Sequence, residues 1–403
     1  TDPPVVDPAN AVFVWTGAAT DSSITFRFSE LLLPCAVEAG TEVTSSNCSA
    51  DTSSVTNTTA TYTRSWTLSG LSDCTTYAYT FYRTDDTTQK VAGTFKTFPS
   101  STNTSCNVSF ILGSCASTGS DSEVWDQMRA HSASLFIHMG DLHYDDLEED
   151  ASIQQRYVSY LKVLNATQYC DAWSLARQAA VYRALPVAYI WDDHDFLGND
   201  ASGLDTSGNT KSATTDALNA YQAYVPHYPL KVPGTLYQSF DIGDLARVII
   251  TDLRTQRQNE GSSTQMMGTD QKTQFFSDLA NSSAPPLVIW VCNSPWLFRD
   301  GSDSDTWGYH SDYDSFASEL NTTLTDMASA GRYLLMVSGD MHSTGWDDGT
   351  NTGIGTPGFP LLQAAAFDRR FGGESCKGGP YTASDFCEYQ GKPEDCAWGR
   401  YGV

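Results

Sequence analysis

Residues of types that can bind metal ions follow short apolar segments at five separate places in this sequence. These segments alternate with longer helical stretches such as 151–184, 269–280 and 314–330. The segments and their polar successors are VSFIL before Cys115, SLFIHM before Asp141 and Tyr144, PVAYI before WDDHD at 191–195, LVIWVC before Asn293, and YLLMV before Asp340 and His342. Strands alternating with helices predict a layered α/β core, and the carboxyl ends of such strands meet at one sheet edge. We therefore expect these polar groups to meet in space.

The first hundred residues have a different pattern. Between residues 11 and 98 the sequence alternates short strand-like runs with turns rich in Ser, Thr, Asp and Asn, which predicts an all-β sandwich. The stretch LSDCTTYAYTF at 71–81 resembles the tyrosine corner of fibronectin type III and immunoglobulin-like modules. We predict a β-sandwich domain over 1–100 and a catalytic domain over 106–403, which ends in a Gly- and Cys-rich irregular cap over 373–403.

Charge and hydropathy exclude two classes of partner. Asp and Glu total 48 against 23 Lys and Arg, a formal net charge of -25 that repels nucleic-acid backbones and anionic membrane surfaces. No apolar run approaches the roughly 18 residues that a membrane span requires. We expect no nucleic-acid binding through a basic surface, no membrane span, and a monomer.

Cysteines and glycosylation sequons point to an oxidising compartment. The ten cysteines form no CxxC pair, so disulfides explain most of them. Cys74 and Cys106 are placed to tie the linker at 99–107 to the small domain, and Cys35 and Cys48 are placed for a local bridge. The seven Asn-x-Ser/Thr sequons stand at Asn47, Asn57, Asn103, Asn107, Asn165, Asn281 and Asn321. With a chain that begins at Thr1, as after signal cleavage, these features predict a secreted protein.

Each polar motif also has a structural explanation when it is taken alone. A cysteine after a strand is often a packed thiol or half of a disulfide, and Gly-Asp after a strand is often a turn with a helix cap. Asp192 to His194 could form a salt-bridged loop. The occurrence of all these motifs in one sequence favours a metal site. A cluster of carboxylates, imidazole, phenol and thiol is tolerable in a low-dielectric cleft only with multivalent cations.

The ordered set of motifs resembles a known family. GSC, GDxxY, WDDHD, the segment TDLRTQR at 251–257, NSP and SGDMH look like those of the PhoD-type alkaline phosphatases, within the calcineurin-like metallophosphoesterase superfamily. The resemblance covers most of the chain. It implies a small immunoglobulin-like domain ahead of an αββα core of two packed sheets.

The resemblance also implies roles for individual residues. Ferric iron would be held by a cysteine, a tyrosine, a bridging aspartate and a histidine, which match Cys115, Tyr144, Asp141 and His342. Calcium would lie beside Asp193 and Asp340, His194 would stand beside the substrate, and Asn293 would approach the second metal or the phosphate. Arg254 and Arg257 could hold the phosphate or brace the sheet edge. A metal-bound Cys115 stays out of disulfides, and Cys292 is then the expected buried thiol.

These observations predict a secreted, metal-dependent alkaline phosphatase. Water or hydroxide activated by iron and calcium would attack phosphate monoesters, with His194 as the general acid. The sequence has no GxSxG elbow and no phosphate-binding loop with lysine. Two alternatives stay open: a phosphodiesterase acting on polymeric or lipid-derived diesters, and a calcium-dependent adhesion or carbohydrate-binding protein. The second alternative would need carboxylates but neither a thiolate nor a phenolate.

Overall fold

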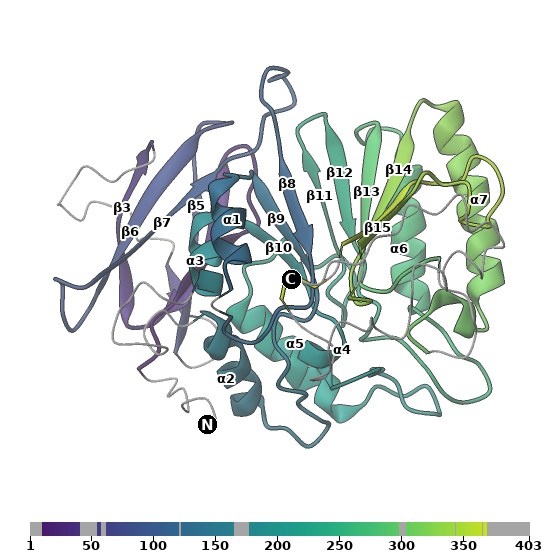
Figure 1. Ribbon diagram of the computed structural model, residues 1–403, viewed down its shortest axis with the longest axis horizontal. Helices are drawn as coiled ribbons and strands as arrows, with labels where there is room; N and C mark the ends of the chain where they lie inside the picture. The colour runs from purple at the N-terminus through teal and green to yellow at the C-terminus, as the bar shows by residue number, and fades with distance from the viewer. Residues whose placement is uncertain are drawn as a thin grey trace.

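Two sheets form the centre of the molecule. The computed structural model describes residues 10–40, 55–57, 62–120, 122–164, 177–297, 304–342, 344–364 and 366–368. Within them, a seven-stranded sheet has the order β4-β5-β2-β1-β10-β9-β8, and a six-stranded sheet has the order β11-β12-β13-β14-β16-β15 (Figure 1). A third sheet, β3-β6-β7, lies at the N-terminal end of the molecule.

The site-bearing part of the first sheet is parallel. Its strands are β8 (Phe110–Gly113), β9 (Leu135–Met139) and β10 (Val187–Ile190). Every residue of β9 and β10 is buried, and both strands are rich in apolar residues, as expected for parallel strands covered on both faces. All three strands were predicted from the sequence and are confirmed.

The second sheet is mixed. Strand β11 (Gln238–Ile242) is antiparallel to β12 (Ala246–Ile250), and β12, β13 (Leu287–Cys292), β14 (Tyr333–Ser338) and β16 (Leu361–Ala364) are parallel. The edge strand β15 (Thr344–Asp347) is antiparallel to β16. The sequence analysis missed β15 and β16, because their sequences, TGWD and LLQA, lack the continuous apolar run of an equally short strand such as β10, VAYI.

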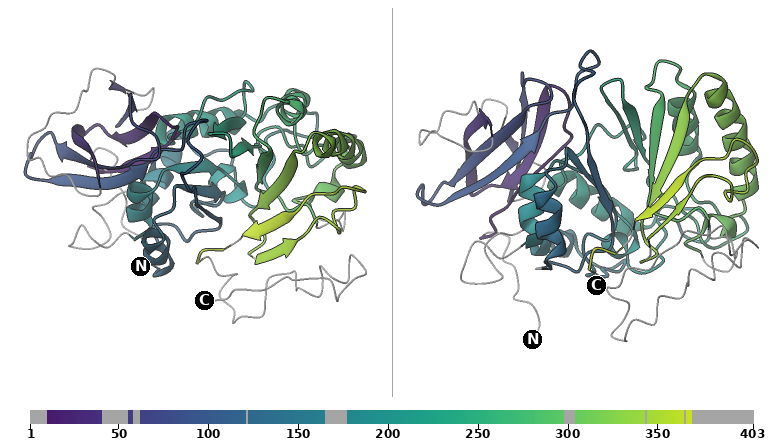
Figure 2. Two further views of the ribbon diagram at one scale, coloured as in Figure 1. Left: turned by 90° about the horizontal axis from the view of Figure 1, so that it is seen from above. Right: turned by 45° about the horizontal axis from the view of Figure 1, so that its top comes forward.

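Strand β13 shows how the layers are built. Ile289 and Val291 belong to the core shared with the first sheet, whereas Val288, Trp290 and Cys292 belong to the core beneath the helices. This alternation follows from the two-residue period of a strand. Helices α6 (Thr269–Ala280) and α7 (Tyr313–Ser329) cover that outer face (Figure 2).

The remaining helices lie nearer the first sheet. They are α1 (Val124–Ala130), α2 (Ile153–Leu164), α3 (Arg177–Ala184), the short α4 (Asp193–Phe196), and α5 (Ser212–Tyr224). Tyr182 of α3 stacks on Phe136 of β9 with ring centroids 6.0 Å apart. Helices thus lie outside both central sheets, and the predicted mixed α/β fold is confirmed.

The N-terminal strands extend the first sheet. They are β1 (Val14–Gly17), β2 (Ser23–Ser29), β4 (Thr56–Asn57) and β5 (Thr63–Ser69), and the separate sheet contains β3 (Leu32–Ala39), β6 (Thr76–Arg83) and β7 (Lys90–Lys96). Phe26 of β2 contacts the rings of Tyr79 and Phe95 from the other sheet, so aromatic side chains fill the space between the two. Strand β1 is also parallel to β10, with Gly17 opposite Val187. The sheet therefore continues across the predicted domain boundary, and that boundary stays a prediction.

The described cysteines have the states that were predicted from the sequence. Cys74 and Cys106 form the predicted disulfide, and Cys115 and Cys292 are free and buried. Cys35 is disulfide-bonded, but Cys48 and the cap at 373–403 lie outside the described residues.

None of the described helices is long and apolar enough to cross a membrane.

Packing in the core beneath helices α6 and α7 allows one prediction about stability. Trp290 is fully buried against Phe275, Trp296 and Trp307. Trp290→Ala should lower the free energy of unfolding by about 3–5 kcal/mol, because a large cavity replaces the indole. Urea unfolding measures this change. Tyr333→Ala, at a residue 63% exposed on the adjacent strand, is the control, and an equal loss in both variants would contradict the packing described.

Candidate metal centre

The predicted site residues meet at the carboxyl ends of the parallel strands. Cys115, Asp141, Asp193, Asn293 and Asp340 each lie within three residues of the last residue of β8, β9, β10, β13 or β14. These strands belong to two different sheets, so the site lies where the two sheet edges adjoin. The strand order explains why residues far apart in the sequence come together.

Four of these residues have a left-handed backbone. The φ angles are 60° at Cys115, 57° at Asp141, 71° at Asp340 and 47° at His342. A non-glycine residue in this region costs roughly 1–3 kcal/mol, which the surrounding structure must offset. Such strain collects at functional sites, and here it turns the backbone sharply two to four residues after each strand ends.

The first group of side chains contains a thiol. Ligand atoms of Cys115, Asp141 and His342 all lie within 4.8 Å of one another. The Tyr144 hydroxyl donates a hydrogen bond to Asp141 Oδ2 at 2.7 Å and lies 2.9 Å from His342 Nε2. Burial and the nearby Asp141 carboxylate raise the pKa of the Cys115 thiol well above its ordinary value. A cation bound here would reverse that balance and favour the thiolate.

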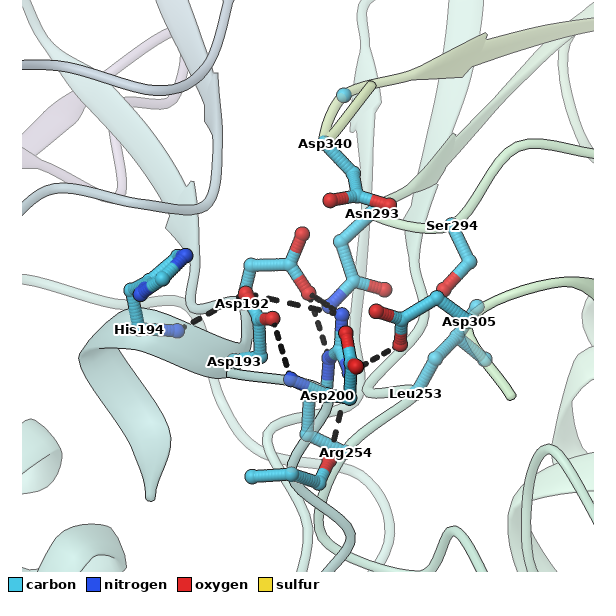
Figure 3. Close-up of polar contacts among 12 residues, drawn as sticks. Asp192, Asp193, His194, Asp200, Leu253, Arg254, Asn293, Ser294, Asp305 and Asp340 are labelled. Atoms are coloured by element: carbon cyan, nitrogen blue, oxygen red, sulfur yellow. Dashed lines mark hydrogen bonds and ion pairs between the residues drawn. The ribbon is translucent and has the colours of Figure 1, made fainter. Parts of the chain in front are cut away.

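Carboxylates extend the site beyond this group. Three further sets of ligand atoms lie within 4.8 Å of one another: Asp141, Asp193 and His194; Asp192, Asp193 and Asp340; and Asp193, Asp200 and Asp305. Asp193 belongs to all three sets and Asp141 links them to the thiol group. Figure 3 shows Asp193 between His194 and Asp200, with Asp340 on the opposite side of Asp192. The structure therefore describes one continuous cluster.

The WDDHD motif is a strand end that begins a helix. Asp192 is the N-cap of α4, and it forms a capping box in which the Asp195 side chain also bonds the Asp192 N–H. Asp195 further accepts a hydrogen bond from Tyr189 at 2.5 Å. These bonds explain the local fold and leave Asp193 and His194 on the first turn beside the cluster.

Two buried arginines cross-link the strand ends. Arg254 Nε donates to Asp192 Oδ1 at 2.6 Å, and its Nη1 donates to Asp305 Oδ1 at 2.5 Å. Arg257 pairs with Asp305 as well and donates to Ser294 Oγ at 2.5 Å. Both guanidinium groups are fully buried. Burial tends to raise the pKa of Asp305, but the two arginines outweigh it and hold that pKa below its ordinary value.

The amide of Asn293 is oriented by its neighbours. Its Nδ2 donates to the Trp191 carbonyl at 2.9 Å and to Asp192 Oδ1 at 3.0 Å. Its buried Oδ1, like Asp141 Oδ1 and Asp192 Oδ2, has no hydrogen-bond partner among the described residues. Buried acceptors without donors are costly, and a cation satisfies them.

The protein's own cationic groups do not balance the negative charge of the cluster. Six aspartates, 141, 192, 193, 200, 305 and 340, face two arginines, 254 and 257. Burial and mutual repulsion raise the pKa of Asp141 and of Asp340, and burial raises that of Asp192 to about 7 despite Arg254. The donor set of carboxylates, imidazole, thiol and phenol thus fits multivalent metal ions.

Three residues at the site, Asp146, Asp200 and Asp305, were not assigned from the sequence. Asp146 pairs with Nδ1 of His194, and its only sequence signal is its place at the end of GDLHYDD. Asp305 joins Arg254 to Arg257, although no apolar strand precedes it in the sequence. Charge complementarity across distant loops positions Asp146 and Asp305.

The comparison with protein families decides the identity. The family model described as PhoD-like phosphatase matches residues 110–356. The chain belongs to the PhoD-like phosphatase family. It is therefore a hydrolase that acts on phosphoric ester bonds, a metal-dependent phosphoesterase. Family membership favours an enzyme over the adhesion alternative.

Solved structures share the fold. A structure described as "Structure of PhoD" is 17% identical with a TM-score of 0.63, and the match covers 88% of this chain and 76% of that one. The purple acid phosphatase PPD1 from seeds of yellow lupin (Lupinus luteus) is 14% identical with a TM-score of 0.54, covering 92% and 67%. No curated protein sequence matches the chain. At these identities the two structures establish similarity of fold.

The arginine network makes a prediction for the metal-free protein. Arg254→Leu leaves the carboxylates of Asp192 and Asp305 with less compensation, so the free energy of unfolding should fall by about 3–5 kcal/mol. Arg129→Leu, which breaks an exposed pair with Asp126, should cost at most about 1 kcal/mol. Urea unfolding in excess chelator measures both variants. Equal stability of the two would show that the buried network contributes little.

Proposed function

We propose that this PhoD-like phosphatase hydrolyses phosphate monoesters at a centre of ferric iron and calcium, and that it acts outside the cell. The observation that carries the proposal is the convergence of Cys115, Asp141, Tyr144 and His342. Phenolate and carboxylate are hard ligands that suit a trivalent ion, and a thiolate beside them adds negative charge.

The opposite part of the cluster offers oxygen ligands. Asp193, Asp340 and the Asn293 carbonyl oxygen provide hard donors without sulfur, which favours calcium. Asp141 lies between this part and the thiol group, as a bridging ligand would. Because both N–H bonds of the Asn293 amide are engaged, its remaining oxygen suits a cation better than a phosphate oxygen.

The protein's own residues orient the reactants. Bound cations would supply Lewis-acid polarisation of the phosphate and a water of lowered pKa. Asp146 holds the His194 ring through Nδ1, which orients His194 for the proposed proton transfer to the leaving oxygen. Arg254 and Arg257 are engaged with buried carboxylates, so we assign them to holding the strand ends rather than the substrate.

One observation supports the phosphodiesterase alternative. A pocket of about 460 Å³ borders the cluster at Asp200 and is lined by Glu149, Asp205, Lys211 and Glu260, among others. It offers room for the second alcohol of a diester.

Secretion is supported by the Cys74–Cys106 disulfide, since such bonds persist in oxidising compartments.

Metal analysis beside hydrolysis tests the proposal. We expect about one equivalent of iron together with calcium by mass spectrometry, and release of aryl alcohol from an aryl phosphate monoester that a chelator abolishes. A bis-aryl diester assayed in parallel decides between the two esterase activities, and faster diester turnover would favour the alternative. Hydrolysis that persists in the metal-free protein would contradict the metal centre.

The two free cysteines form a matched pair for the iron assignment. Cys115 and Cys292 are both buried, but only Cys115 lies among the proposed ligands. Cys115→Ser should lose most of its iron and activity, because the soft, charged thiolate is replaced by a neutral hydroxyl, and Cys292→Ser should keep both. Iron content and kcat measure the effect, and an active, iron-loaded Cys115 variant would refute the assignment.

A further inference from the structure

A short C-terminal segment contacts the loop that carries Cys115. We call residues 366–368 the C-terminal anchor. Asp368 Oδ1 accepts a hydrogen bond from the Ser117 N–H at 2.8 Å, and Asp368 Oδ2 accepts one from the Ser120 hydroxyl. One carboxylate therefore holds two points of the loop just after Cys115.

Residue Phe367 fixes the other end of the same loop through its backbone N–H and its ring. Its N–H donates to the Ser114 carbonyl at 3.1 Å, and its ring centroid lies 5.0 Å from that of Trp125 and 5.6 Å from that of Phe136. A Cβ at Gly113 would approach the Phe367 ring to 2.2 Å. The strand before Cys115 thus ends in a glycine where the ring requires the space.

The loop faces the cluster on its other side. The N–H of Cys115 donates to the Gly140 carbonyl at 3.1 Å, and the N–H of Ala116 donates to the Asp141 carbonyl at 2.9 Å. Cys115 is held between the anchor and the strand end of β9, with its backbone in the left-handed region. A strained conformation of this kind persists only when contacts on several sides determine it.

We propose that Phe367 and Asp368 are positioning residues, which hold the Cys115 loop so that the thiol faces the metal cluster. This inference rests on the proposed function, because it takes Cys115 as a ligand. Both residues lie beyond the 110–356 segment that the family model matches. The metal centre of this chain then depends on residues outside that segment.

Thiol reactivity in the metal-free protein tests the anchor without an activity assay. After removal of metal with a chelator, iodoacetamide labelling of Cys115 and Cys292 is followed by mass spectrometry. Asp368→Ala removes two hydrogen bonds, and Cys115 should be labelled about tenfold faster than in the unaltered chain, with Cys292 unchanged. Phe367→Ala should act in the same direction. Asp368→Asn, which retains an acceptor oxygen for the Ser117 N–H, should restore most of the protection.

A matched control comes from the N-terminal sheet. Asp86 also accepts a backbone N–H and a hydroxyl, both from Thr88, at 3.1 and 2.6 Å. Asp86→Ala should leave the labelling of both cysteines unchanged. Equal acceleration at Cys115 and Cys292 in the Asp368 variant would mean that the anchor serves the whole fold, and it would overturn the proposal.

Cobalt binding separates failure of this inference from failure of the proposed function. Co²⁺ added to the metal-free protein should give a thiolate-to-cobalt absorption band that Cys115→Ser abolishes and Asp368→Ala weakens at equal Co²⁺. A band that survives Cys115→Ser would refute Cys115 as a ligand. A band lost in Cys115→Ser but intact in Asp368→Ala, with normal labelling rates, would refute the anchor alone.

Discussion

Uncompensated negative charge at the junction of two sheets is the constraint on which the rest of this structure depends. Carboxylates placed in a low-dielectric cleft repel one another and raise each other's pKa. The protein supplies two guanidinium groups, at Arg254 and Arg257, and both are engaged with Asp305. The remaining charge requires cations, so metal binding and stability of the site are coupled.

The fold meets that constraint by distributing the acidic residues over many strand ends. Each strand is followed by one to three candidate ligands, and its apolar body packs in a core away from the charge. The left-handed turns at Cys115, Asp141, Asp340 and His342 bring these side chains toward one another within two to four residues of the preceding strand end. Stability from the cores thereby offsets strain at the centre.

Much of this arrangement could be predicted from the sequence, for identifiable reasons. The strand LVIWVC is a continuous apolar run, and the helix Thr269–Ala280 is long and periodic. The type and position of such elements therefore follow from the pattern. The polar residues that follow the apolar strands were predicted to lie together because the carboxyl ends of such strands meet at one sheet edge. Strand β3 escaped notice because Pro34 and the bulge beside it interrupt its alternation. Asp146 and Asp305 could not be placed, since their partners are set by loops from other parts of the chain.

The pairing of β1 with β10 has a consequence for the exposure of the first sheet's parallel strands. A strand at the margin of a sheet exposes unpaired N–H and C=O groups that invite pairing with another chain. Here β10, which ends at the WDDHD motif, has β9 on one side and β1 on the other. The N-terminal strands thus keep the strand that leads into WDDHD from becoming an edge. A chain without the N-terminal strands would expose β10 as an edge strand, so the β-rich region protects the strand that leads into the metal cluster.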